Sequence, residues 1–232
     1  MVNDSFIKLW NDLASVDCGP KLINQFSLHD FIPNKWFDWK TVSNRDVMIV
    51  GQDWGPYVFL KKYVDRYTLE SKDKSFDYDK FLFETFSSRT ERMIIQSLEN
   101  SFQERFGKRM MRKHWNDFFF TVAVFFCRTG TLFRGSENFD KKGLELSLPF
   151  LKRQINLVKP KVIITLGDMA LRQIISALNI PIDYKNLSQF IKDTDKDKYF
   201  IFNQIVIIPS FHPAAHVNPK IIYDRLAILW KI

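Results

Sequence analysis

The sequence predicts an α/β fold in which helices cover both faces of a parallel β-sheet. Four nearly continuous apolar runs are typical of strands buried on both faces: Val47–Val50, Phe118–Phe126, Val162–Leu166 and Ile205–Ile208. Apolar residues at helical spacing lie between these runs, and strands that alternate with helices favour a parallel sheet. The 232 residues contain no repeat or clear linker, so residues 1–232 are predicted to form a single domain, with a core over residues 46–232 and peripheral helices and loops over residues 1–45.

The helices of the core are predicted from their start and stop signals. The capping-box spacing Ser88-Arg89-Thr90-Glu91 begins a helix whose apolar residues follow at helical intervals: Met93, Ile94, Leu98 and Phe102. Ser147 and Pro149 predict the start of a second helix, which ends before Pro160. These helices would connect the first three strands.

The last part of the chain follows the same pattern. Gly167 ends the third strand, Asp168 is expected to cap the next helix, and a last helix is predicted to begin near Pro219. Tyr199–Phe202 is compatible with a hairpin to the fourth run through Asn203-Gln204. Two charged stretches are expected to be surface loops: Lys72–Lys80 and Asp183–Lys198.

Composition narrows the function classes. The chain is 46% hydrophobic and 16% aromatic, but it contains no run of 18 apolar residues, so a transmembrane helix is not expected. The N-terminus lacks signal-peptide features, and two cysteines, Cys18 and Cys127, are typical of a reduced, cytoplasmic protein. The net charge of +8 favours a polyanionic partner, of which nucleic acid is the commonest.

Two short segments combine a strand end with side chains that can do chemistry. The first is Gly51-Gln52-Asp53-Trp54-Gly55-Pro56, and the second is Pro209-Ser210-Phe211-His212-Pro213-Ala214-Ala215-His216. Loops that leave the carboxyl ends of parallel strands gather at one crevice. We therefore expect Asp53 and His212 to line one pocket, close enough to face the same small ligand.

Each of these two residues has a functional and a structural interpretation. The Asp53 carboxylate can orient a water or stabilise positive charge on a sugar, or it can simply cap the next turn. His212 is expected at the N-terminus of a short helix begun by Pro213, where its imidazole can stabilise negative charge on a carbonyl oxygen. The alternative is a hydrogen-bonded loop histidine.

Other chemistry is not indicated. His212 and His216 have a spacing that can share a metal, but no third ligand lies nearby, so neither a metal nor another cofactor is expected. Dinucleotide, phosphate-loop and nucleophile-elbow motifs are absent. A basic cluster either contacts phosphates or forms a solvated helix face: Arg105, Lys108, Arg109, Arg112 and Lys113, followed by Trp115.

Three segments together resemble the uracil-DNA glycosylase superfamily. The segment from Gly51 to Pro56 resembles its first active-site motif, and Pro209–Ala215 resembles its His-Pro motif after the last core strand. Between them, Pro160–Ala170 is similar to the family's third core strand and following helix. The resemblance implies a three-layer α/β/α sandwich with a central four-stranded parallel sheet. It also implies an enzyme that cleaves the N-glycosidic bond of uracil or another damaged base flipped from DNA.

The resemblance assigns roles to particular residues. Asp53 would position the water or stabilise the oxocarbenium-like sugar, and His212 would donate toward the carbonyl oxygen of the leaving base. Base contacts would come from the first motif and its surroundings: Gly51, Gln52, Trp54, Gly55, Tyr57 and Ser210. The DNA contacts would come from the His-Pro loop and the basic cluster: Pro213, Ala214, His216, Val217, Arg109 and Arg112.

This chain departs from the family in three ways. Val122 and Ala123 stand where the family's base-reading Asn is expected, and Asn116 is a possible substitute. Gly55 replaces a Tyr that excludes thymine in the most uracil-selective branch. Two cysteines cannot hold the iron–sulfur cluster that some branches bind through four. Two further hypotheses therefore stay open: a catalytically altered member that binds nucleic acid or protein, and an α/β enzyme acting on a free nucleoside or other small molecule.

Overall fold

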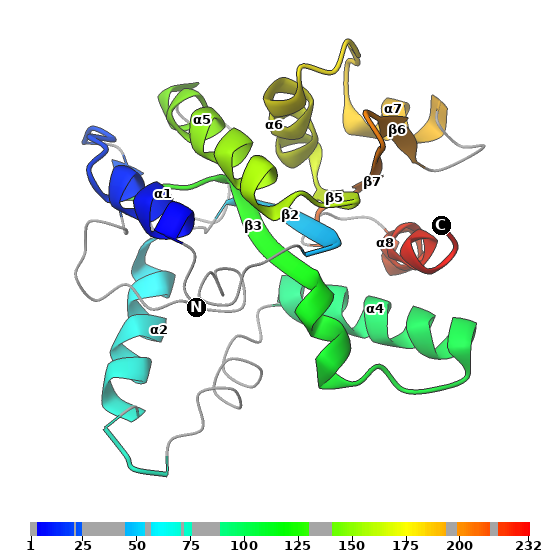
Figure 1. The fold of residues 1–232 in the computed structure, drawn as a ribbon, viewed down its shortest axis with the longest axis horizontal. Coiled ribbons are helices and arrows are strands. Elements are labelled where there is room, and N and C mark those ends of the chain that lie inside the picture. Colours follow the sequence, from blue (N-terminus) through cyan, green and yellow to red (C-terminus); the bar gives the residue numbers. More distant parts are fainter. Residues whose placement is uncertain are drawn as a thin grey trace.

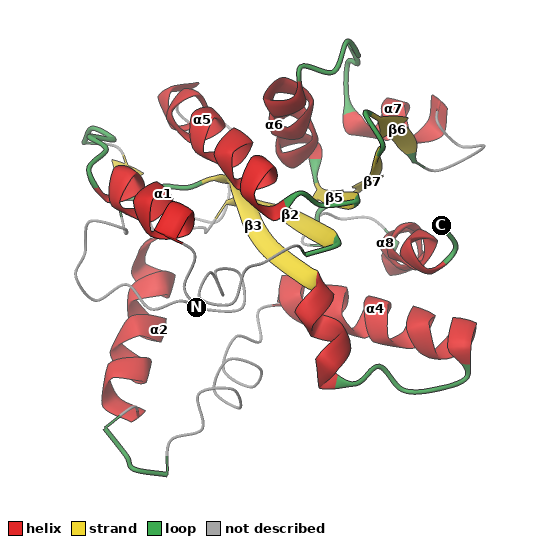
Figure 2. Cartoon of the chain, in the orientation of Figure 1, coloured by secondary structure: helices red, strands yellow, loops and turns green. Residues whose placement is uncertain are grey.

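The computed structural model describes residues 4–20, 22–24, 45–53, 57–70, 72–75, 89–129, 141–193, 199–213 and 218–232. Its centre is a five-stranded sheet with the order β3-β2-β5-β7-β6 (Figures 1 and 2). The first four strands are parallel: β3 (Phe118–Val124), β2 (Val47–Asp53), β5 (Val162–Leu166) and β7 (Ile205–Ser210). The predicted α/β class with a mainly parallel sheet is therefore confirmed, and each of the four apolar runs forms a strand.

The fifth strand is the predicted hairpin partner. β6 (Phe200–Phe202) pairs antiparallel with β7, with Phe202 opposite Ile205. The two turn residues, Asn203 and Gln204, both have positive φ angles, 46° and 68°. Positive φ at both central positions is the backbone geometry of a tight two-residue hairpin.

Helices lie on both sides of this sheet (Figure 1). On one side α5 (Lys141–Val158) packs against β3, α6 (Asp168–Leu178) packs against β5, and α1 (Asp4–Ala14) lies outside α5. On the other side α4 (Arg89–Phe106) packs against α8 (Pro219–Leu226) and against the 3₁₀ helix η6 (Ala227–Trp230). The remaining elements are short or peripheral: β1 (Leu22–Ile23), α2 (Tyr57–Glu70), η4 (Arg112–Asp117), β4 (Cys127–Arg128) and α7 (Leu187–Asp193).

The start of α5 differs from the prediction. The helix begins at Lys141, so Pro149 lies inside it, and Gly143, Ser147, Leu151 and Ile155 form its buried face. The Ser147 hydroxyl does not cap the helix; it accepts a hydrogen bond from the backbone N–H of Phe125 at 3.0 Å. Burial of this face outweighs the cost of an internal proline, about 3 kcal/mol.

The segment Asp183–Lys198 also differs, because it is not simply a surface loop. It contains α7, in which Leu187, Phe190 and Ile191 are buried. Their spacing of three and four residues places them on one face of a helical turn, and the surrounding charges obscured that pattern in the sequence. None of the helices in the described ranges is long and apolar enough to cross a membrane.

Two buried threonines in this sheet offer a matched test of its polar contacts. The Thr121 hydroxyl in β3 donates to Oε1 of Gln154 in α5 at 2.7 Å. The Thr165 hydroxyl in β5 is also buried, but it has no hydrogen-bond partner among the described residues. Leaving a buried acceptor without its donor lowers the stability by about 1–3 kcal/mol. A buried hydroxyl that has no partner already carries such a cost, so its removal should not lower the stability further.

We expect Thr121→Val to lower the free energy of unfolding by about 1–3 kcal/mol, because Gln154 loses its donor. The same substitution at Thr165 should leave the free energy unchanged or raise it. Urea denaturation of both variants and the wild type measures the difference. Equal losses at the two positions would contradict this assignment of the hydrogen bonds.

Candidate active site

The carboxyl ends of β2, β5 and β7 meet around Gly167, the residue that follows β5. The Gly167 N–H donates to the backbone carbonyl of Ser210 at the end of β7, at 2.8 Å. A methyl group placed on Gly167 would lie 3.2 Å from Cβ of His212 and 3.5 Å from Oε1 of Gln52. Gln52 and His212, which are far apart in the sequence, therefore lie beside the same glycine.

The backbone of Gly167 requires a residue without a side chain. Its φ is 99° and its ψ is 168°. This region is open essentially to glycine alone, and other residues there are strained by about 1–3 kcal/mol. The position is also crowded, because Cβ of His212 would lie closer than ordinary van der Waals contact. Because residue 167 is glycine, no side chain at the end of β5 enters the space between Gln52 and His212.

His212 is half-buried in the segment that leaves β7. Burial lowers the pKa of its imidazole below the usual value of 6.5. The ring is therefore neutral at physiological pH and keeps one N–H donor. Pro213 is a turn residue and residues 214–217 lie outside the described part, so the short helix expected after His212 stays a prediction. Desolvation by burial accounts for the lowered pKa of His212.

The other predicted residues of the first motif lie at the same edge of the sheet. Gly51 is buried opposite Val122 of β3, and Asp53 is the last residue of β2, with its backbone opposite Val124. Tyr57 is the first residue of α2 and is half-buried. The Asp53 side chain and residues Trp54 and Gly55 lie outside the described part. The expected distance between Asp53 and His212 therefore stays a prediction.

The second motif is described as far as Pro213, and the residues that follow it lie outside the described part. The Ser210 side chain is fully buried, and its hydroxyl donates to the backbone carbonyl of Phe211 at 3.3 Å. This contact stabilises the loop that carries His212. Pro213 is buried, while Ala214, His216 and Val217 fall outside the described residues, so their predicted contacts with DNA remain predictions.

The end of β3 offers no polar side chain to a ligand. Residues 122–127 are Val, Ala, Val, Phe, Phe and Cys, and all of them are buried. Asn116 is not a substitute at this edge, because it belongs to η4, which directly precedes the amino end of β3. Among the described residues at this edge, polar side chains therefore come from the β2 and β7 sides, from Gln52 and His212.

The structure separates Arg109 and Arg112 from this edge. Both follow the end of α4, and Arg112 begins the 3₁₀ helix that leads into the amino end of β3. β3 has seven residues, and strands rise about 3.3 Å per residue, so roughly 20 Å of strand separates the amino end of β3, which these arginines precede, from its carboxyl end. The resemblance assigned these arginines to DNA contacts together with the His-Pro loop. The fold places them before the amino end of β3, whereas the His-Pro loop follows the carboxyl end of β7.

A cluster that sequence reasoning missed adjoins Gly167. Oδ2 of Asp168 pairs with Nε of Arg172 at 2.7 Å, and the Asp168 backbone carbonyl accepts from the Tyr184 hydroxyl at 3.2 Å. The Arg172 guanidinium lies 4.5 Å from the centre of the Tyr184 ring, and burial raises the pKa of that tyrosine. Asp168 therefore does not cap α6, for which Gly167 is the N-cap. The cluster fixes the start of α6, and with it Gly167, against the loop that carries Tyr184.

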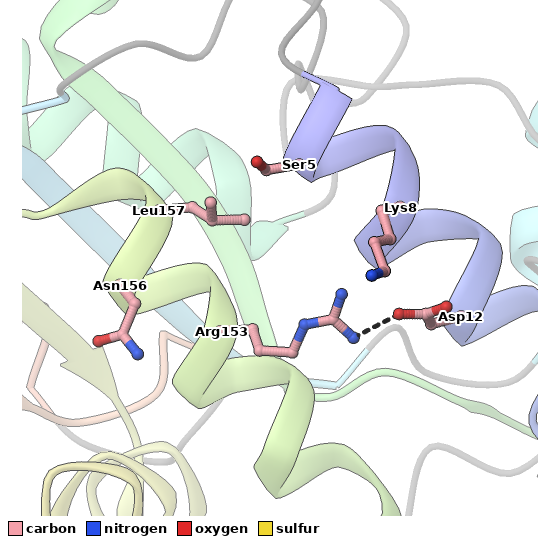
Figure 3. Close-up of a pocket in the computed structure, with 6 residues that line it drawn as sticks. All are labelled: Ser5, Lys8, Asp12, Arg153, Asn156 and Leu157. Carbon is pink, nitrogen blue, oxygen red and sulfur yellow. Dashed lines mark ion pairs between the residues drawn. The ribbon is translucent and has the colours of Figure 1, made fainter.

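The groove in Figure 3 lies elsewhere. It has a volume of about 530 Å³ and lies between α1 and α5, lined by Ser5, Lys8, Asp12, Arg153, Asn156 and Leu157 (Figure 3). Arg153 pairs across it with Asp12 at 2.7 Å. None of its lining residues belongs to the carboxyl ends of the strands, so this groove is not the predicted base pocket. Among the described residues, no group of three His, Cys, Asp or Glu side chains is placed to hold a metal ion.

The lowered pKa of the half-buried His212 predicts a pH dependence of stability. Its pKa in the folded state lies below 6.5, so between these two values the unfolded chain binds more protons than the folded one. The stabilising contribution is therefore present above pH 6.5 and is lost as the pH falls through the folded pKa. We expect the wild type to lose more unfolding free energy than His212→Asn between pH 7.5 and pH 5.5, about one unit on each side of that reference value.

Denaturant titrations of both proteins at the two pH values measure this difference, and the remaining histidines contribute to both alike. A His212 ring that titrates at or above 6.5 by NMR would contradict the assignment of a desolvated imidazole.

Comparison with known proteins agrees with this geometry. A family model of the uracil DNA glycosylase superfamily matches residues 40–221. A type-4 uracil-DNA glycosylase from Sulfurisphaera tokodaii is 33% identical over 76 residues, an alignment that covers 32% of this chain and 32% of that relative. The family match contains all three strand ends that meet at Gly167. Since it spans most of the chain, this protein belongs to the uracil DNA glycosylase superfamily.

Proposed function

We propose that this protein is a DNA glycosylase that hydrolyses the N-glycosidic bond of uracil or another damaged base extruded from DNA. The observation that carries the proposal is the convergence of Gln52 and His212 on Gly167, within a chain that belongs to this superfamily. The partial likeness to a protein named type-4 uracil-DNA glycosylase supports the same reaction class.

In this proposal His212 acts on the leaving base. As the glycosidic bond breaks, negative charge develops on the carbonyl oxygens of the base. A neutral imidazole N–H can donate a hydrogen bond to that oxygen, and in a desolvated site such a donor is worth far more than in water. The lowered pKa of His212 supports a neutral donor rather than an imidazolium.

Asp53 is proposed to act on the sugar. Its backbone ends β2 directly after Gln52, at the edge where His212 also lies. A carboxylate there would orient the attacking water or stabilise the oxocarbenium-like sugar. The base would then lie between a group that stabilises the cation and a group that stabilises the departing anion.

The base specificity is proposed to be broader than that of a strict uracil enzyme. The buried end of β3 offers only apolar side chains where an amide would read the base edge, and Gly55 has no side chain in place of the Tyr that would exclude a methyl group. Discrimination by a site is strongest where buried polar groups would be left unpaired by the wrong ligand. Here, Gln52 and the backbone at the end of β2 are proposed to supply those polar contacts.

DNA is the proposed partner. The net charge of +8 attracts the phosphate backbone, and extruding a base costs a few kcal/mol that phosphate and pocket contacts must offset. The loop after His212, with Pro213, Ala214, His216 and Val217, is proposed to press on the minor groove while the base is extruded.

A base-panel cleavage assay tests this proposal. Oligonucleotides that each contain one U, hypoxanthine or xanthine are incubated with the protein, and alkali then cleaves the strand at any abasic site. We expect scission with at least one base, and a loss of about 10²–10³-fold in rate for His212→Asn, the loss typical of one removed transition-state donor. Asp53→Asn should abolish or strongly reduce scission.

Asp224→Asn is the matched control, because Asp224 is a surface carboxylate of α8 that pairs only with Lys220 among the described residues. It should cleave at the wild-type rate. Binding of DNA without strand scission at any of the tested bases would contradict catalysis and favour an altered member of the family. Turnover of free nucleosides without DNA binding would instead indicate a small-molecule enzyme.

A further inference from the structure

A basic and partly aromatic surface lies at the end of α4, at the amino-terminal edge of the sheet. We define this α4-end surface by Arg105, Phe106, Lys108, Arg109 and Met111. Phe106 is 46% exposed and Met111 is 59% exposed, so two large apolar side chains face solvent on this surface. In Figure 1 this end of α4 lies at the right of the view, on the side away from α2.

The exposed Phe106 ring is held in place by other rings. It packs at 4.7 Å from the ring of Phe102 and at 6.3 Å from that of Trp230, in a tilted and an edge-on arrangement. Phe102 also contacts His114 at 4.9 Å and Trp230 at 5.1 Å. Because its inner edge is fixed by this cluster, the outer part of Phe106 is a preformed apolar platform.

Cationic side chains surround that platform. Residues 104–117 contain five basic and two acidic residues. Nε of Arg105 donates to the backbone carbonyl of Trp230 at 3.3 Å, which holds this cation beside the rings. Lys108 and Arg109 form no ion pair among the described residues, although Arg109 lies near Glu99 and opposes the burial that raises the pKa of that carboxyl.

This surface is distant from the candidate active site. It is joined to the amino end of β3, whereas Gln52 and His212 lie at the carboxyl ends of the strands. The length of β3, roughly 20 Å at 3.3 Å per residue, lies between the amino end of the strand and the edge where Gln52 and His212 meet. The α4-end surface is therefore a separate contact, and its argument does not depend on catalysis.

We infer that the α4-end surface binds single-stranded nucleic acid, with an unpaired base stacked on Phe106 and the strand's phosphates beside Arg105, Lys108 and Arg109. Proteins that bind single strands without sequence preference combine cations along the backbone with aromatic rings under the bases. A duplex hides the faces of its bases, so it would use the cations but not the exposed ring. The exposed ring at this position favours an unpaired strand.

Fluorescence anisotropy with a labelled oligo-dT of about 15 nucleotides tests the inference, since one single-strand site covers roughly 4–16 nucleotides. The probe contains no damaged base and does not require the base pocket. We expect Phe106→Ala to weaken binding about tenfold, the effect of losing one stacked base, and Phe106→Trp to retain it. Lys108→Glu with Arg109→Glu should weaken binding and reduce the salt dependence of the affinity by about 1.4 in logarithmic slope.

The matched control makes the same charge change elsewhere: Lys74→Glu with Lys152→Glu, both at exposed positions outside this surface. It should bind oligo-dT nearly as the wild type does. Thermal unfolding of every variant checks that the α4 ring cluster is intact.

Three outcomes would overturn the inference: unchanged oligo-dT binding in the Phe106→Ala and charge-reversal variants, equal losses in the control pair, or a loss confined to duplex DNA. Base excision from a short duplex is measured with the same variants, so a failure of the catalytic proposal can be told apart from a failure of this inference. Loss of oligo-dT binding supports this surface whether or not any base is excised.

Discussion

The arrangement of the candidate site depends on the backbone of Gly167. The parallel register brings the ends of β2, β5 and β7 to one edge, and the Gly167 N–H holds β5 to β7 through the Ser210 carbonyl. The φ of 99° then turns the chain into α6 without a side chain between Gln52 and His212. Asp168, Arg172 and Tyr184 fix the residues that follow. A local backbone requirement thus determines which distant side chains share a site.

The environment of that site explains the chemistry that we propose. His212 is desolvated and hence neutral, which suits a donor to a leaving base rather than a fixed positive charge. The buried end of β3 is apolar, so it supplies packing but no hydrogen bonds to a base. In our proposal, polar contacts with a base come from the β2 and β7 sides, above all from Gln52 and backbone groups, and a broader range of bases is the expected result.

Much of the fold could be predicted from local patterns, and the failures have identifiable causes. Apolar runs located the four parallel strands, and the capping box located α4. Ser147 followed by Pro149 is a pattern typical of a helix start, yet α5 begins at Lys141 and the Ser147 hydroxyl accepts a hydrogen bond from the backbone N–H of Phe125, just after β3. The α7 helix was obscured by charges around Leu187, Phe190 and Ile191. The sequence indicated that the two motifs meet. It could not indicate the role of Gly167, the Asp168 cluster or the separation of Arg109 from the site. These features depend on which end of the sheet each segment reaches.

The measurement that tests this account most directly is a comparison of Gly167→Ala with Gly107→Ala. Both glycines have positive φ, 99° and 65°, so both variants should lose stability, about 1–3 kcal/mol at Gly167. An added methyl at Gly107 meets no atom within 4 Å, whereas at Gly167 it meets Cβ of His212 at 3.2 Å. NMR of the imidazole should therefore show a displaced His212 signal in Gly167→Ala alone, with base excision reduced in that variant only. An unchanged His212 signal and an unchanged excision rate in folded Gly167→Ala would contradict the central claim.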